Sequence, residues 1–282
     1  MNKKFESSKI LLLVLLLGVV LTACSSKGNS EISVITREEG SGTRSAFVEI
    51  VGILEKNEAG EESDMTSVEA VVQNNTEAVL TSVGSNVNAI GYISLGSLND
   101  SVRALKVDGV EATAENVKAG DYKIQRPFNI VYDAGVSDGV QDFLKFIKSD
   151  EGQKIAEEEG YIADMSGEEY NAVDNQESIT IAGSTSITPL MEKLVESYKK
   201  FNPLFKADIQ ATGSSAGVQS VQEGSAEIGM VSRELKDSES NLGNEVIARD
   251  GIVVINNLES EIDNLSLEDI KSIFKGEKTT WE

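Results

Sequence analysis

Strand-like and helix-like hydrophobic patterns alternate along the chain from about residue 31 to its end. Short runs rich in Val, Ile and Tyr predict strands, whereas apolar residues that recur every three or four positions predict helices. Because the two patterns alternate, we expect an α/β protein with mostly parallel sheets. The predicted strands cover residues 31–37, 89–95, 103–107, 124–132, 179–183, 207–211, 227–231 and 245–256.

Helical patterns fill most of the segments between these strands. Residues 65–83 read mainly as helix, and residues 140–159 read as a long amphipathic helix that breaks near Asp150. Residues 161–178 are polar and acidic, show no clear periodicity, and are interpreted as a linker. The other predicted helices cover residues 43–54, 187–201 and 214–223.

Two local signals refine this assignment. Ser266 and Asp269 have the spacing of a capping box, which predicts a helix from there to Phe274. Pro127 lacks a backbone N–H and cannot complete a central sheet ladder, so strand 124–132 is predicted to be an edge strand or irregular.

The first residues have the pattern of an export signal. Lys3 and Lys4 precede an apolar run over residues 10–21, which is shorter than the roughly 20 residues of a membrane-spanning helix. The sequence LTAC that ends at Cys24 resembles the bacterial lipobox, in which the cysteine is lipidated and becomes the mature N-terminus. Residues 24–30 would then be a polar tether. The alternative is a short N-terminal membrane helix.

Composition excludes several classes of function. The formal net charge of −22 argues against nucleic acid as a partner, because like charges would meet. The chain has no histidine, which excludes a Ser-His-Asp triad, and its single cysteine excludes an internal disulfide. The same inventory argues against a zinc or copper site, because histidine and free cysteine are the usual ligands. Neither a Walker A sequence nor a dinucleotide-binding fingerprint is present.

Three segments share one pattern, in which a strand is followed by a Gly/Ser/Thr turn and then by a helix. Each turn would place backbone N–H groups and small hydroxyls at a helix N-terminus, where the helix dipole also favours an anion. The alternative is that the serines only cap their helices, which is their commonest role. The segments are residues 36–43, 181–187 and 211–217.

Arg37 precedes the first of these turns and strengthens the anion hypothesis. A guanidinium can hold an oxyanion through two parallel hydrogen bonds, and Glu39 is placed to hold Arg37 in position. The alternative is a surface ion pair between Arg37 and either Glu38 or Glu39.

Together these segments resemble the phosphate-binding proteins of bacterial high-affinity phosphate ABC importers. The resemblance extends from Glu31 to the end of the chain and is also carried by IGYISL and VDGVEAT. The strongest motifs are ITREEGSGTRSAF from Ile35, AGSTSITP from Ala182, ATGSSAGV from Ala211 and AEIGMVSREL from Ala226.

The resemblance implies a two-lobed periplasmic-binding-protein fold of type II, each lobe a mixed, mostly parallel sheet flanked by helices, that closes around inorganic phosphate. It also implies which residues bind the ligand. Well-known members have an aspartate that accepts a proton from phosphate, and Ser232 stands at that position here. The implied phosphate-binding residues are Arg37, Ser41, Gly42 and Thr43 from one lobe, and Ser184, Thr185, Ser186, Ser214 and Ser232 from the other.

The order of the segments departs from the usual family order. Such proteins normally begin with the AGST strand and reach GSGTR in mid-chain, whereas here GSGTR comes first. The chain therefore reads as a circular permutant whose usual ends are joined through residues 161–178; the alternative is a fragment of a tandem duplication. Domain I would then be continuous over residues 91–249, and domain II would combine residues 31–90 with 250–282.

We therefore expect an extracytoplasmic lipoprotein, anchored to the cell membrane through Cys24. It would be a monomer without a cofactor or metal, and it would pass phosphate to the membrane subunits of an ABC importer. One alternative is a binding protein for sulfate or molybdate, which Ser232 keeps open. Another is a sensor or adhesion lipoprotein. A hydrolase using Ser41 or Ser214 is disfavoured, because neither serine has an adjacent base.

Overall fold

The computed structural model describes residues 31–57, 62–163 and 167–281. The predicted signal peptide, Cys24 and the whole of the predicted tether lie outside the described residues. Residues 32–279 form one compact unit. In the small remaining unit, Glu31 and Thr280 form an isolated antiparallel bridge.

The strands in the described part of the chain form one large mixed sheet and two small two-stranded sheets. They are β1 (Ser33–Arg37), β2 (Leu54–Lys56), β3 (Glu62–Asp64), β4 (Val71–Gln73), β5 (Ala89–Ser94), β6 (Arg103–Ala104), β7 (Lys106–Val107), β8 (Gln125–Tyr132), β9 (Ser178–Gly183), β10 (Lys206–Gln210), β11 (Ile228–Val231), β12 (Gly243–Asn256) and β13 (Asn264–Leu265).

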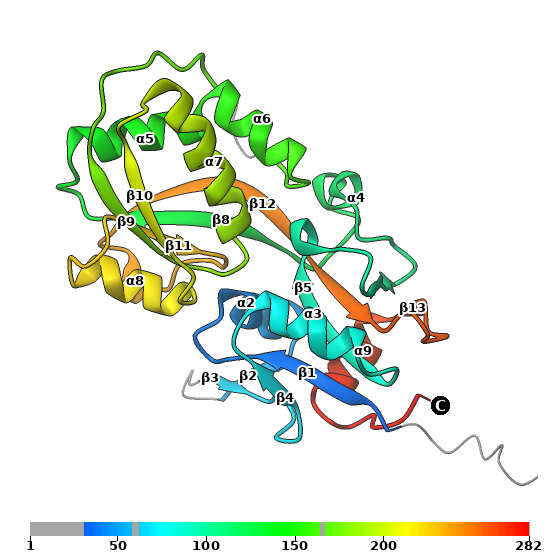
Figure 1. Cartoon of the computed structure of the whole chain (residues 1–282). Helices are drawn as coiled ribbons and strands as arrows, with labels where there is room; N and C mark the ends of the chain where they lie inside the picture. The colour runs from blue at the N-terminus through cyan, green and yellow to red at the C-terminus, as the bar shows by residue number, and fades with distance from the viewer. Residues whose placement is uncertain (1–30, 58–61, 164–166, 282) are drawn as a thin grey trace, which may run out of the picture. The chain divides into compact units, whose positions relative to one another are not determined.

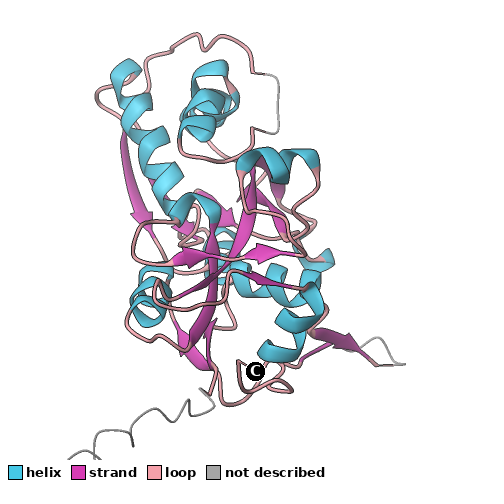
Figure 2. Cartoon of the chain, turned by 90° about the vertical axis from the view of Figure 1, so that its right-hand side faces the viewer, coloured by secondary structure: helices cyan, strands magenta, loops and turns pink. Residues whose placement is uncertain are grey.

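The helices pack around the strands of the large sheet, as Figures 1 and 2 show. They are α2 (Gly42–Val51), α3 (Thr76–Gly84), α4 (Ala114–Ala119), α5 (Asp138–Lys148), α6 (Asp150–Glu158), α7 (Thr188–Phe201), α8 (Ser214–Gln222) and α9 (Leu267–Phe274).

Strand β12 joins the two halves of the large sheet, whose order is β10-β9-β11-β8-β12-β5-β1-β4. Its first part pairs with β8, and residues Ile252–Asn256 pair with β5. We call lobe I the strands β8, β9, β10 and β11 with helices α5, α6, α7 and α8. Lobe II comprises strands β1, β4, β5 and β6 with helices α2, α3 and α9. The expected two-lobed α/β architecture is confirmed.

The outer strands of both lobes are parallel, whereas β8 and β12 pair antiparallel with all their neighbours. This arrangement follows from the path of the chain. Strand β8 carries the chain from lobe II into lobe I, and β12 carries it back in the opposite direction. The parallel character expected from alternating strands and helices therefore applies away from these two crossings.

Each lobe has its own apolar core. In lobe I, helices α5, α6 and α7 cover one face of the sheet, where Phe143, Phe146 and Tyr198 are fully buried. Helix α8 covers the opposite face through Val218 and Val221. In lobe II, α3 packs on one face. On the other, Phe47 of α2, Tyr92 of β5 and Phe274 of α9 form an aromatic cluster with ring centroids 4.0 to 5.5 Å apart.

One local prediction was wrong and a second was wrong in part. Residues 65–83 are not mainly helical, because β4 occupies Val71–Gln73 and α3 begins only at Thr76, after Asn75 caps it. Strand β8 is central and not at an edge, but its pairing with β12 is irregular, as the other alternative expected, with a register shift between Val246 and Ala248. Its Pro127 lies outside the part that pairs with β11, Asn129–Val131, so β11 needs no N–H from it. The predicted break near Asp150 and the capping box of Ser266 and Asp269 are both confirmed.

The described residues of the predicted linker, 161–163 and 167–177, form no helix and no strand beyond an isolated bridge at Ile162. A buried polar network holds its later part on lobe I. The hydroxyls of Tyr170 in the linker and Tyr198 on α7 both donate to the Asp142 carboxylate, each over 2.6 Å. The amide Nδ2 of Asn175, also in the linker, donates to the Tyr198 hydroxyl at 2.7 Å. The linker thus packs against α5 and α7 through buried polar groups that hydrogen-bond to one another.

Substituting Tyr198→Phe tests this network. The change removes the acceptor of the Asn175 amide and one of the two donors to the Asp142 carboxylate. Because both groups are buried, we expect the free energy of unfolding to fall by about 1 to 3 kcal/mol. Urea denaturation followed by circular dichroism measures the loss. Tyr132→Phe is the matched control, because the Tyr132 hydroxyl makes only a 3.4 Å, part-buried contact with Glu245. Equal stability of both variants would contradict a structural role for the network.

Candidate anion-binding site

The first turn of α2 brings lobe II into direct contact with lobe I. Strand β1 ends at Arg37, and Ser41 caps α2 by accepting a hydrogen bond from the Arg44 N–H at 3.3 Å. A Cβ atom placed on Gly42 would lie 2.3 Å from the Ser214 Oγ and 2.7 Å from the Ser232 Oγ. Only glycine allows this approach, so the two lobes meet where a side chain would separate them.

The lobe I side of this contact is built from three loops at neighbouring strand ends. Strand β9 leads to Ser184, β10 leads to Ser214 at the start of α8, and β11 leads to Ser232. The Ser184 Oγ donates to the Ser232 Oγ at 2.8 Å, and the Ser232 N–H donates to the Ser214 Oγ at 3.1 Å. All three side chains are buried, so these hydroxyls form one connected cluster.

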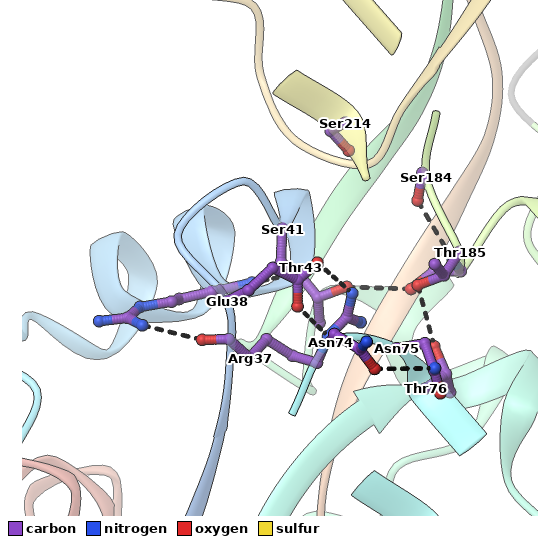
Figure 3. Close-up of polar contacts among 12 residues, drawn as sticks. Arg37, Glu38, Ser41, Thr43, Asn74, Asn75, Thr76, Ser184, Thr185 and Ser214 are labelled. Carbon is purple, nitrogen blue, oxygen red and sulfur yellow. Dashed lines mark hydrogen bonds and ion pairs between the residues drawn. The ribbon is translucent and has the colours of Figure 1, made fainter. Parts of the chain in front are cut away.

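Two further hydroxyl pairs cross between the lobes. Thr43 Oγ1 lies 2.9 Å from Ser186 Oγ, and Thr76 Oγ1 lies 3.3 Å from Thr185 Oγ1. Figure 3 shows Thr43 and Thr76, from the starts of α2 and α3, facing Thr185 of lobe I. The backbone adds another link, because the Ser215 N–H donates to the Gly40 carbonyl at 3.2 Å.

Arg37 is buried at the same place and is not a surface residue. Its partner is Glu38 and not Glu39: Nε and Nη2 donate to the two carboxylate oxygens, both at 2.8 Å. This pair uses two of the five N–H donors of a guanidinium. The Glu38 carboxylate also reaches lobe I, because its Oε1 lies 3.5 Å from the position of a Cβ on Gly213.

The helix ends distinguish the two interpretations of the serines. Ser41 does cap its helix, as the simpler interpretation expects. Helices α7 and α8, by contrast, begin without a side-chain cap at Ile187 and Gly213. Before α7, the Ser184 side chain accepts from the Ser186 N–H and the Ser184 carbonyl accepts from the Thr188 N–H, both at 3.2 Å. At α8 the Ser215 N–H donates to Gly40 of lobe II. The positive ends of both helix dipoles nevertheless lie beside the contact between the lobes. Such ends favour an anion.

All nine residues expected to bind the anion belong to this region. Hydrogen bonds or close approaches connect Gly42, Thr43, Ser184, Thr185, Ser186, Ser214 and Ser232. Arg37 and Ser41 come from the same turn of lobe II, and Figure 3 shows Arg37 in the same group of side chains as Thr43 and Thr76. The structure therefore brings all nine to one place, the contact between the lobes.

Two residues of this region were not predicted from the sequence. Thr76 follows Asn74 and Asn75 at the start of α3, a polar run typical of a helix N-terminus, but the interpretation of 65–83 as helix concealed it. Arg44 lies on α2 and donates through Nη1 to the Arg37 carbonyl at 2.8 Å. It also pairs with Asp64. Burial raises the pKa of Asp64, but hydrogen bonds from Thr66 and the Arg44 charge outweigh it, so the net pKa is lowered.

A cavity of about 740 Å³ lies elsewhere, on lobe I beside α5 and the linker. Its lining includes Tyr132, Lys148 and Tyr170 and none of the nine residues above. The described residues also contain no group of three or more Asp, Glu, His or Cys side chains placed to hold a metal. None of the helices in the described part of the chain combines the length and apolarity that a membrane span requires.

Comparison with known proteins identifies the family. The model of the PBP superfamily domain matches residues 25–151 and 170–282. Phosphate-binding protein PstS 2 of Streptococcus agalactiae is 45% identical over 287 residues, which covers 99% of this chain and 98% of that protein. The chain belongs to the PstS family of phosphate-binding proteins.

Other family members agree with this assignment. PstS 2 of Streptococcus pneumoniae is 44% identical over 288 residues, covering 99% of both chains. The crystal structure of a phosphate ABC transporter phosphate-binding protein from Streptococcus pneumoniae TIGR4 is 47% identical. It superposes with a TM-score of 0.71 and covers 89% of this chain and 98% of that one. The expected family resemblance is thereby confirmed.

Family members differ in how much of this chain they match. The streptococcal proteins align almost end to end, so they share its order of segments. The PstS of Bacillus subtilis is 31% identical over only 137 residues, or 48% of this chain and 42% of that protein. A different order of the two halves would produce such a partial match. Circular permutation relative to the usual family order stays a prediction.

Replacing Gly42 tests the contact between the lobes. A methyl group in Gly42→Ala would clash with the hydroxyls of Ser214 and Ser232. Overpacking of this kind costs about 1 to 3 kcal/mol, so we expect about tenfold weaker binding of inorganic phosphate in calorimetry. Gly40→Ala is the control, because a Cβ there meets nothing within 4 Å. Equal affinities of the two variants would show that the observed close approach is not needed for binding.

Proposed function

We propose that this protein binds inorganic phosphate between lobes I and II and delivers it to an ABC importer. The observation that carries the proposal is the convergence of uncapped helix N-termini, buried hydroxyls and one buried guanidinium at a single contact between the lobes. A tetrahedral oxyanion offers several acceptor oxygens, and it loses its hydration shell only where as many donors replace it. Membership of the PstS family favours phosphate among such anions.

The nine residues contribute to binding in three ways. Ser184, Thr185, Ser186, Ser214 and Ser232 present hydroxyls and amides from lobe I, and Ser41, Gly42 and Thr43 do so from lobe II. Arg37 supplies the positive charge, and Glu38 holds the guanidinium from its Nε and Nη2 side. This division leaves the rest of the guanidinium for the ligand.

Transport requires the ligand to change the conformation of the protein, and it requires no chemical reaction of the ligand. An anion held by both lobes binds the closed arrangement more tightly than an open one, and therefore shifts the population toward closure. The membrane subunits of the importer would recognise that closed form. The protein acts in this proposal as a monomeric binding protein and not as an enzyme.

The proposal also covers the parts of the chain outside the described residues. Cys24 would carry the lipid that anchors the protein to the outer face of the cell membrane. Residues 25–30 would be the tether. Within the fold, we propose that lobe II extends beyond residue 90, because β5 pairs with β1, and β6 pairs with the end of β12 that also pairs with β5. The crossings in β8 and β12 would then be the boundaries between domains.

One observation favours a second candidate ligand. Ser232 stands where well-known family members have an aspartate, and a hydroxyl can both donate and accept a hydrogen bond. Such a site does not repel a fully deprotonated anion as a carboxylate would, so sulfate or molybdate remains the alternative. A role in sensing or adhesion would be favoured only if no oxyanion binds.

Calorimetric titration of the purified protein with phosphate and with sulfate tests the proposed ligand. We expect phosphate to bind at least about tenfold more tightly, because each protonated phosphate oxygen can donate to Ser232 while sulfate has no proton to offer. The comparison should be repeated between pH 5 and pH 8. A preference for sulfate at every pH would overturn the assignment to phosphate.

Substituting Arg37→Ala tests the charge in the site. Removing one partner of a buried, hydrogen-bonded charge pair costs about 2 kcal/mol or more, so phosphate affinity should fall about thirtyfold or more. Arg103→Ala is the control, because this lobe II arginine donates to the backbone carbonyls of Leu258 and Ser260. A loss of less than about twofold in Arg37→Ala would mean that Arg37 does not contact the anion.

A further inference from the structure

A buried ion pair lies where β12 exchanges one partner strand for the other. Asp250 is opposite Arg126 of β8, and two residues later Ile252 pairs with Ser94 of β5. The side chains of Arg126 and Asp250 are 1% and 0% exposed. The pair therefore sits at the crossing between the lobes, at the position where a change in their relative orientation would be absorbed.

Hydrogen bonds connect this pair to lobe II on one side. The Asp250 Oδ1 accepts from the Ser94 hydroxyl at 2.9 Å and from the Leu95 N–H at 3.1 Å. Its Oδ2 accepts from Arg126, from Nε at 3.2 Å and from Nη2 at 2.9 Å. Both carboxylate oxygens are thus engaged, one by each side of the crossing.

The same pair reaches the candidate site on the other side. The Nη1 of Arg126 donates to the backbone carbonyl of Ser232 at 3.1 Å. Ser232 accepts from Ser184 and faces Gly42 of the opposite lobe. A continuous path of hydrogen bonds therefore runs from Ser94 through Asp250 and Arg126 to Ser232.

Stability alone is a weak reason for such a pair. Burying two charges costs several kcal/mol per ion, and hydrophobic replacements of buried pairs are often neutral or stabilising. The pKa of Arg126 is lowered, chiefly by burial and to a smaller extent by the charge of Arg37, while Asp250 acts in the opposite direction.

We propose that Arg126 and Asp250 are positioning residues that link lobe orientation to the anion site. Asp250 fixes Arg126 relative to Ser94 of lobe II, and Arg126 fixes the backbone of Ser232, so that the Ser232 hydroxyl faces the oxyanion only when the crossing has the closed geometry. The ligand side of this inference rests on the proposed function. The proposed effect of Arg126 on the backbone of Ser232 is independent of the proposed function.

The experiment compares two variants with the wild-type full chain. Arg126→Lys keeps the charge but not the forked geometry, and the double variant Arg126→Met with Asp250→Asn removes both charges, so that neither is left buried without a partner. Amide hydrogen exchange of Ser232 is measured by NMR without ligand, and the affinity for inorganic phosphate is measured by calorimetry.

We expect Ser232 exchange to be about tenfold faster in the double variant, with a smaller change in Arg126→Lys, and phosphate affinity about tenfold lower. Asp142→Asn is the matched control: its carboxylate is buried in lobe I and accepts two tyrosine hydroxyls, remote from this path. It should lower stability but leave Ser232 exchange unchanged and phosphate affinity within about twofold.

Unchanged Ser232 exchange in both Arg126 variants would overturn the inference. Faster exchange with undiminished phosphate affinity would also overturn it, because Ser232 would then be positioned without consequence for the ligand. If the wild-type protein itself bound no phosphate, the proposed function would fail. The exchange measurement would still decide whether Arg126 positions Ser232.

Discussion

The close approach of Gly42 to the hydroxyls of Ser214 and Ser232 is the contact on which the rest of the candidate site depends. It sets the distance between the first turn of α2 and the start of α8, and it brings the hydroxyls of Thr43 and Ser186 within hydrogen-bonding distance. An oxyanion can leave water only where several donors surround it at once. Separate lobes can provide such a set because no side chain keeps their backbones apart at this point.

Apolar packing within the fold is separate for the two lobes. Each lobe has its own apolar core, with α5, α6 and α7 on one face of lobe I and α3 on one face of lobe II. Continuous backbone joins the lobes through β8 and β12, which cross in opposite directions. Apolar packing therefore holds each lobe together internally. Between the lobes, the hydrogen bonds that bear on the site join hydroxyl and backbone groups.

Charge is distributed to match this division. The chain as a whole is strongly acidic, yet the buried guanidiniums of Arg37 and Arg126 lie near the contact between the lobes. The Glu38 carboxylate accepts hydrogen bonds from Arg37, and the Asp250 carboxylate accepts them from Arg126. Overall charge thus affects solubility and long-range repulsion, whereas a few buried donors decide what the site accepts. The net charge of −22 and an anion ligand are compatible for this reason.

The sequence alone determined the α/β class, most strand positions, the capping box at Ser266 and the family, because these depend on local periodicity and on short motifs. It also indicated the three turns and Arg37, since glycine and small hydroxyl residues before a helix have a limited set of uses. Only the tertiary structure decided which carboxylate holds Arg37, that Thr76 joins the site, and that Pro127 lies in a central strand. Those outcomes depend on which segments meet in space, and the path from Ser94 to Ser232 joins four positions that no local pattern connects.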